Sequence, residues 1–266
     1  MSIPRAFVLF IVMMFGPYAS GEKGAYSEVQ LMKKHRKWWI GLLVLVAIGL
    51  GVFGFQSSMS HQQEEQIVAL GDSLTYGVGD ESGHGYVENL QQWFDKNHDD
   101  PVTVDNYAIP GQQSDGMLDQ MNETSVMKSI EHADYILFFI GMNDIIKSNG
   151  GDLSPLYEDK IAMGKKDYEK NVKTILDQIR EENPEAPILF LGLYNPYPDN
   201  PEVGQIIKGW NDTSESIVGS YENITFIPTN DLYEEKSSRY FSDEVHLNEQ
   251  GYEKLTMRII KAYDFK

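Results

Sequence analysis

Three side chains in the sequence have the types and spacing needed for nucleophilic chemistry. Ser73 follows the apolar run 67–70, while Asp243 and His246 stand three residues apart near the carboxyl end. A serine within reach of a histidine is a potential nucleophile, and an aspartate on the other ring nitrogen fixes the tautomer and orientation of that histidine. We also expect Gly71 to take backbone angles forbidden to a side chain, so that the chain turns sharply and presents Ser73. These residues predict acyl transfer.

Ester cleavage creates an alkoxide, which needs hydrogen-bond donors already aimed at it. The sequence offers three candidates for this oxyanion hole: the backbone N–H groups of Ser73 and Gly111, and the side-chain amide of Asn143. Glycine at position 111 leaves room for close approach of a substrate to the backbone. The neighbouring acids Asp72 and Asp144 are expected to tie down their own turns rather than contact substrate.

Each of these residues also has an interpretation without catalysis. Ser73 alone could cap a helix, Gly111 alone could be a turn glycine, and Asn143 could hydrogen-bond its own turn. Asp243 and His246 could be two metal ligands, although the sequence shows no further ligand cluster beside them. We therefore expect no metal and no cofactor. The catalytic reading depends on a fold that brings these positions together.

The pattern of apolar residues predicts such a fold. We expect strands at 67–70, 102–107, 135–140, 187–194 and 224–227, and helices at 85–97, 113–132, 165–182, 203–221 and after Asn248. Segments 145–164 and 194–199 are expected to be loops that line the substrate pocket. Continuously apolar strands separated by helices predict an α/β fold, a three-layer doubly wound parallel sheet. Its strand-end loops would place Ser73, Gly111 and Asn143 along one rim.

Taken in order, these positions resemble the sequence blocks of a known family. Gly71-Asp72-Ser73-Leu74, then Gly111, Gly141-Met142-Asn143-Asp144 and Asp243-Glu244-Val245-His246 are similar to the four blocks of the GDSL or SGNH hydrolases. The resemblance implies a flavodoxin-like fold and ester hydrolysis, with Ser73 as nucleophile and Asp243 and His246 completing the triad. It also implies that Gly111 and Asn143 complete the oxyanion hole. In detail the chain is similar to exported lipase/acylhydrolases of Gram-positive bacteria, and it lacks the Gly-x-Ser-x-Gly elbow of α/β-hydrolases.

The amino-terminal part of the chain predicts a membrane anchor. Residues 38–55 form an uncharged apolar run of 18 residues, which as a helix would reach about 27 Å, close to a ~30 Å hydrocarbon layer. Basic residues at 33–37 precede the run, and two tryptophans begin it. This order predicts a single-pass protein of the cell membrane whose catalytic domain is extracellular. The alternative is a cleaved signal peptide and a secreted domain.

The predicted layout has four parts. Residues 1–31 are an uncertain extension, because Met32 begins an ordinary export-signal pattern and is a candidate start site. Residues 32–56 are the basic flank and the anchor or signal, and 57–64 form a Ser/Gln-rich linker. Residues 65–266 form the SGNH hydrolase domain.

Composition limits the partners of this domain. The chain has no cysteine, which excludes a disulfide framework, a thiolate metal site and a cysteine nucleophile. Its formal net charge is −18, and residues 57–266 hold 16 basic against 38 acidic residues, a net of −22. Such a surface repels phosphate backbones, so we expect no nucleic-acid partner. The expected substrate is a lipid, lysophospholipid or other acyl ester, and the alternative substrate is O-acetylated cell-wall polysaccharide. The alternative to an enzyme is a catalytically silent binding module. The oligomeric state is left open.

Overall fold

Apolar runs form the strands of the computed structural model, which describes residues 64–98 and 101–265. Within these residues the strands are β1 (Glu65–Gly71), β2 (Val102–Asn106), β3 (Tyr135–Phe139), β4 (Ile188–Leu191) and β5 (Ile224–Ile227). They form one parallel sheet in the order β2-β1-β3-β4-β5. Every residue of β3 is buried, because helices cover both faces of the sheet and leave no face for polar side chains.

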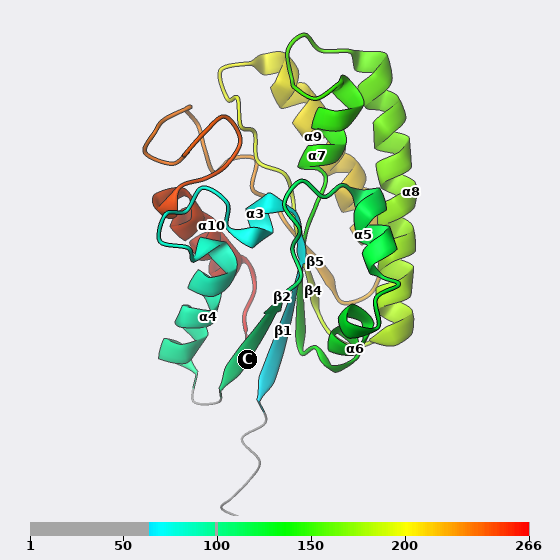
Figure 1. The fold of residues 1–266 in the computed structure, drawn as a ribbon, viewed down its shortest axis with the longest axis vertical. Coiled ribbons are helices and arrows are strands. Elements are labelled where there is room, and N and C mark those ends of the chain that lie inside the picture. The colour runs from blue at the N-terminus through cyan, green and yellow to red at the C-terminus, as the bar shows by residue number, and fades with distance from the viewer. Residues whose placement is uncertain (1–63, 99–100, 266) are drawn as a thin grey trace, which may run out of the picture. The chain divides into compact units, whose positions relative to one another are not determined.

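Helices connect the strands and form a layer on each side of the sheet (Figure 1). They are α3 (Ser73–Tyr76), α4 (Gly85–Asn97), α5 (Ser114–Gln120), α6 (Thr124–His132), α7 (Met142–Asn149), α8 (Glu158–Glu182), α9 (Pro201–Val218) and α10 (Glu249–Ala262). α4 and α10 pack together on one face, and α5, α6, α8 and α9 cover the other. The predicted α/β fold with a parallel sheet between helical layers is confirmed.

Helix α8 illustrates how the sequence directs this packing. Its predicted apolar stripe is buried in full: Tyr168, Val172, Ile175, Leu176 and Ile179. Residues spaced three and four apart share one face of a helix, so these side chains all meet the sheet layer. Burial of each large apolar side chain stabilises the fold by roughly 1.5–3 kcal/mol.

The largest error in the predicted elements concerns residues 145–164, which are not a surface loop. α7 continues to Asn149 and α8 begins at Glu158, so only the segment between them is irregular. The prediction treated Gly164 as part of a loop, but it lies inside α8. A Cβ there would crowd the Ser148 side chain of α7, so glycine serves close contact between two helices rather than a chain break.

The helices within the described part of the chain include none that is long and apolar enough to cross a membrane. The predicted anchor at 38–55, the candidate start at Met32 and the extension 1–31 lie outside the described residues, as does most of the linker 57–64.

Candidate active site

The carboxyl ends of β1 and β3 lie where the chain changes its direction across the sheet. β1 pairs with β2 on one side and with β3 on the other, so the two connections leave toward opposite edges. Open parallel sheets bind ligands in the crevice at such a switch point. Ser73 follows β1 and Asn143 follows β3, so the topology brings both to this crevice.

Ser73 is the first residue of α3, directly after a tight turn. The Asp72 side chain accepts a hydrogen bond of 2.9 Å from a backbone N–H in the first turn and caps this helix. The expected role of Gly71 was wrong, because its backbone is not in the left-handed region. A Cβ at Gly71 would instead overlap the Thr75 side chain and the Phe139 carbonyl oxygen. Glycine is needed here because β1, α3 and β3 approach closely.

The structure brings together the three residues predicted to form a triad. His246 Nε2 lies 2.9 Å from Ser73 Oγ, and His246 Nδ1 lies 2.7 Å from Asp243 Oδ2. Ser73 is 9% exposed, whereas the side chains of His246 and Asp243 are 24% and 53% exposed. The ring therefore links a nearly buried hydroxyl to an acid at the surface.

Asp243 is set up to accept hydrogen bonds in its ionised form. Partial burial alone would raise its pKa, but the backbone N–H groups of His246 and Val245, together with the imidazole, hold the pKa below its ordinary value of 3.8. The carboxylate is thus ionised at neutral pH and can only accept. It follows that Nδ1 of His246 carries a proton and that Nε2 is free to accept one from Ser73.

Gly111 presents its backbone to open space in the loop after β2. Its loop is tied to β1 by the Ile109 N–H, which donates to the Gly71 carbonyl oxygen at 3.1 Å. Gly111 has a φ of +81°, and a Cβ there would meet no atom within 4 Å. Within the described residues its N–H donates to no acceptor. Ser73, as the first residue of α3, likewise has an N–H that the helix itself leaves without a partner.

Unlike the N–H groups of Gly111 and Ser73, the side-chain amide nitrogen of Asn143 already donates to two acceptors. Nδ2 donates to Asp72 Oδ2 and to the Gln112 carbonyl oxygen, each at 3.0 Å. Because both partners accept hydrogen bonds, the side-chain nitrogen of Asn143, and not its oxygen, faces them. A bound oxyanion would therefore have to share one of these two hydrogens. The same bonds tie the loops after β1, β2 and β3 to one another.

Asp72 is the buried carboxyl of this junction. Its side chain is 1% exposed, and burial raises its pKa to about 7 even though the Leu74 N–H and the Asn143 amide favour the charged form. The expectation that Asp72 ties down its own turn is confirmed by the helix cap, but its side chain also accepts a hydrogen bond from Asn143 in the first turn of α7.

Asp144 was expected to bond within its own turn, and this was wrong. Its carboxylate accepts from the backbone N–H of Ser114 at 3.1 Å and from the Ser114 hydroxyl. Asn171 of α8 donates to that hydroxyl at 3.0 Å. Burial raises the pKa of Asp144 to about 6. Sequence spacing held no signal for this network, because its members come from three separate helices.

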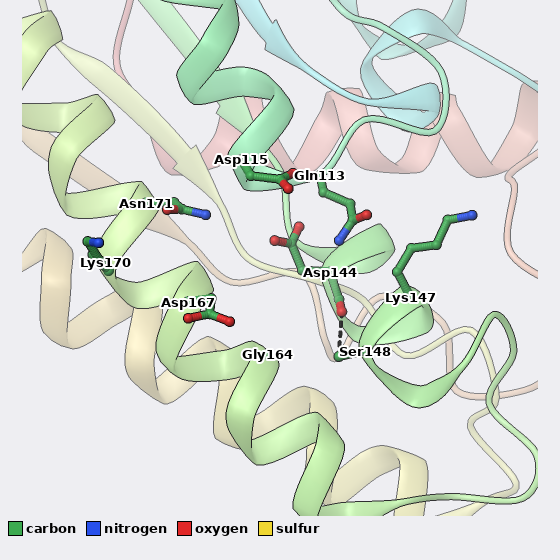
Figure 2. A pocket seen from close by; sticks show the side chains of 9 residues that line it. All are labelled: Gln113, Asp115, Asp144, Lys147, Ser148, Gly164, Asp167, Lys170 and Asn171. Carbon is green, nitrogen blue, oxygen red and sulfur yellow. Dashed lines mark hydrogen bonds between the residues drawn. The ribbon is translucent and has the colours of Figure 1, made fainter.

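Beside this network lies a polar cavity of about 400 Å³ between α5, α7 and α8 (Figure 2). It is lined by Gln113, Asp115, Asp144, Lys147, Ser148, Gly164, Asp167, Lys170 and Asn171. Segment 145–164 contributes part of this lining, but Ser73, Asp243 and His246 do not line it. That this segment lines the substrate pocket therefore stays a prediction.

The alternative that Asp243 and His246 bind a metal finds no further ligand nearby. Within the described residues there is no group of three or more His, Cys, Asp or Glu side chains arranged to hold a metal ion. The two ring nitrogens of His246 face Asp243 and Ser73 instead.

Two known proteins are similar in sequence to most of this chain. The chain is 32% identical over 219 residues to the uncharacterized protein YpmR of Bacillus subtilis, covering 79% of this chain and 86% of YpmR. It is 28% identical over 205 residues to the spore germination lipase LipC of Bacillus licheniformis, covering 74% of this chain and 95% of LipC.

Solved structures show the same fold. The lipase Lip_vut3 from a goat rumen metagenome has a TM-score of 0.68 and 27% identity, covering 74% of this chain and 97% of its own. Axe2, an acetylxylan esterase from Geobacillus stearothermophilus, has a TM-score of 0.61 and 18% identity, covering 76% and 95%; at that identity it shows the fold alone. The model of the GDSL-like Lipase/Acylhydrolase family matches residues 69–254. The chain therefore belongs to the GDSL-like lipase/acylhydrolase family and is a hydrolase of the esterase/lipase type.

Proposed function

We propose that this hydrolase cleaves carboxylic esters through an acyl-enzyme formed on Ser73. The single observation that carries the proposal is the pair of contacts made by His246, 2.9 Å to Ser73 Oγ and 2.7 Å to Asp243 Oδ2. Ser73 Oγ attacks the acyl carbon while its proton passes to His246 Nε2. The same proton then passes to the leaving alcohol oxygen as the ester C–O bond breaks.

The second half of the reaction releases the acid. Water gives a proton to His246 Nε2 and attacks the acyl carbon, and the proton returns to Ser73 Oγ as the acyl bond breaks. Asp243 stays ionised throughout; it orients the ring and stabilises the imidazolium. The N–H groups of Ser73 and Gly111 stabilise the oxyanion, with Asn143 sharing one amide hydrogen.

For the substrate we propose a lipid, lysophospholipid or other acyl ester. Two large apolar side chains stand exposed on the segments that carry the nucleophile and an oxyanion donor: Tyr76, the last residue of α3, is 59% exposed, and Ile109, in the loop before Gly111, is 46% exposed. Apolar surface beside a reacting centre fits an acyl chain better than a polysaccharide. LipC and Lip_vut3, both called lipases, support the same choice.

We further propose that the catalytic domain works outside the cytoplasm, held to the membrane by residues 38–55. This rests on the length of the apolar run and the basic residues before it. Carbonate extraction of membranes from cells making the full chain should leave the protein in the pellet, and protease added to intact protoplasts should digest it. Recovery in the culture medium of a form that begins after residue 56 would support cleavage instead.

The central experiment compares the full chain with its Ser73→Ala variant. The wild type should react with a fluorophosphonate probe and hydrolyse a short acyl ester. Ser73→Ala should lose the label and lower kcat on the order of 10⁴-fold or more, while its circular dichroism spectrum stays unchanged. Full activity of the variant would overturn the proposal.

A substrate series separates the two ester classes. Esters from acetate to palmitate, a lysophospholipid and an acetylated polysaccharide are given to the same protein. We expect kcat/KM to rise with acyl length. A preference for acetyl groups on the polysaccharide would point to an O-acetyl esterase instead. Binding of substrates without turnover or labelling would identify a silent binding module.

A further inference from the structure

The segment that carries Asp243 and His246 lies between β5 and α10 and contains no helix or longer strand. Within it, the turn that carries both residues is closed by an isolated bridge between Phe241 and Leu247. Two backbone hydrogen bonds accompany the bridge, from the Ser242 N–H to the His246 carbonyl oxygen at 3.0 Å and from the Asn248 N–H to the Tyr240 carbonyl oxygen at 2.9 Å. Nothing in a regular ladder therefore sets the direction of the His246 ring, although the ring must meet Ser73 Oγ to within a few tenths of an ångström. The structure shows how other parts of the chain supply this precision.

The peptide group that joins Val245 to His246 is held at both ends. Its N–H donates to Asp243 Oδ1 at 2.7 Å, and its carbonyl oxygen accepts from the Tyr194 hydroxyl at 2.6 Å. A peptide group is planar, so two opposed hydrogen bonds fix its rotation. That rotation sets where the His246 side chain leaves the backbone.

The preceding peptide group, between Glu244 and Val245, is held in the same way. Its N–H donates to Asp243 Oδ1 at 2.8 Å, and its carbonyl oxygen accepts from Lys236 Nζ at 2.6 Å. Lys236 is itself placed over the Phe241 ring, 4.0 Å from the ring centroid. The hydrogen bond from Lys236 Nζ to the Glu244 carbonyl oxygen is exposed, so water can replace Lys236 as the donor.

Tyr194 is the more rigid of the two donors. It lies just beyond β4 and is 0% exposed. Its ring packs against Phe139, Tyr233 and Phe241, with centroid distances of 6.4, 5.2 and 6.1 Å. Burial raises the pKa of Tyr194 well above its ordinary value, so the hydroxyl keeps its proton and remains a donor. Through Tyr194 the buried core of the sheet reaches the turn that carries the base.

We propose that Tyr194 is a positioning residue for His246: its hydroxyl fixes the 245–246 peptide group and thereby aims the ring at Ser73. This rests on the proposed function of the triad. Lys236 assists as a second, weaker hydrogen-bond donor to the backbone of the same turn. Neither residue touches the reacting atoms; each acts through the backbone of the turn.

The test replaces the Tyr194 hydroxyl by hydrogen in the full chain. Tyr194→Phe should lower kcat by roughly 10- to 100-fold, the scale expected when a catalytic group is slightly misplaced. KM should stay within about twofold, since no substrate contact is removed. Lys236→Met keeps the apolar stem and should lower kcat by a smaller factor, about threefold.

The matched control is Tyr233→Phe. Tyr233 packs against Tyr194, is 2% exposed, and donates to the Gly251 carbonyl oxygen at 2.7 Å. Loss of the Tyr233 hydroxyl removes a buried hydrogen bond from the same aromatic cluster, whereas the Tyr194 bond is part-buried, and it leaves the hydrogen bonds of the turn in place. We expect a similar fall in Tm and a kcat within about twofold of the wild type.

A spectroscopic readout separates positioning from general destabilisation. The proton between His246 Nδ1 and Asp243 Oδ2 should give a downfield ¹H resonance in the wild type and in Tyr233→Phe, and a shifted or broadened one in Tyr194→Phe. Equal kcat and equal resonances in the two tyrosine variants would overturn the positioning role. Unchanged kcat in Lys236→Met would remove only the assisting role of Lys236. If Tyr194→Phe does not fold at the assay temperature, the two tyrosine variants are compared at a lower temperature, where equal kcat and equal resonances again overturn the positioning role. Full activity of Ser73→Ala would instead remove the proposed function itself.

Discussion

The two halves of the candidate site are built in different ways. Ser73, Gly111 and Asn143 follow three adjacent strands, and part-buried hydrogen bonds join the segments after these strands directly. Asp243 and His246 sit on an exposed turn that follows no strand end in this crevice. The first half takes its precision from the sheet, and the second takes it from side chains donated to a turn.

This difference has a consequence for stability. In the strand-end half Asn143, a proposed oxyanion donor, also joins the loops after three strands, so its removal should lower both activity and stability. In the turn half the acid and base are partly exposed, so activity should be lost with little unfolding. Substitutions on the two sides test whether this distinction holds.

The largest effect is expected on the turn side. His246→Ala removes the proposed proton carrier, and kcat should fall on the order of 10⁴-fold or more. Because the side chain is 24% exposed, the free energy of unfolding should change by less than about 1 kcal/mol. Ester hydrolysis and urea unfolding measure the two quantities. A large loss of stability would remove the contrast between the halves.

Asn143→Ala tests the strand-end side. Loss of one oxyanion donor should lower kcat on the order of 10²–10³-fold. It also leaves Asp72 Oδ2 and the Gln112 carbonyl oxygen without this partner, which should destabilise the fold by about 1–3 kcal/mol. If stability falls and kcat does not, Asn143 only joins the loops and gives no hydrogen to the oxyanion.

Two glycines in the loop before α4, Gly79 and Gly83, test whether the contact of this loop with the turn that carries His246 matters for activity. Gly79 has a φ of +96°, and a Cβ there would overlap Ser242 Oγ and lie 3.0 Å from His246 Cβ. Gly83 in the same loop has a φ of +75° with no atom within 4 Å of a Cβ. Alanine at either position should destabilise the fold by about 1 kcal/mol through its backbone.

Only Gly79→Ala should also displace the turn. We expect its kcat to fall about tenfold while that of Gly83→Ala stays within about twofold. Steady-state kinetics and thermal unfolding of the two variants give the comparison. An equal kcat for both would mean that the turn does not depend on this contact.

The smallest expected effect is on the pH dependence of stability, through the buried carboxyl group of Asp72. Burial raises the pKa of Asp72 from 3.8 to about 7, so between these values the folded protein holds a proton that the unfolded chain releases. The contribution of Asp72 to stability is full below pH 3.8 and declines as the pH rises through about 7. Asp72→Asn does not titrate and should show a flatter dependence.

Urea midpoints of the two proteins at pH 5 and pH 8 provide the measurement. The raised pKa of Asp144, about 6, acts in the same direction and is present in both proteins, so the difference between them reports Asp72 together with its repulsion by Asp144. Parallel pH dependences would show that Asp72 is ionised in the fold.

Much of the secondary structure of this protein could be predicted from local sequence. Apolar runs and helical periodicity are local properties, so helix 85–97 and strand 224–227 are found as predicted. The sequence blocks likewise singled out Ser73, Asp243 and His246, which the structure brings into contact, because a nucleophile, its base and an orienting acid need particular residue types. Their catalytic roles stay a proposal. Errors arose where glycine served packing rather than turning: Gly71 and Gly164 are small because neighbouring elements approach them.

The tertiary structure alone decided how the two halves meet. Ser73 and His246 are 173 residues apart and come within 2.9 Å, and Tyr194 holds a carbonyl oxygen 51 residues away. No periodicity or spacing encodes such pairs, because they depend on where separate strands and loops end once the sheet has formed. The sequence by itself determined which groups can react. Packing decided which of them touch.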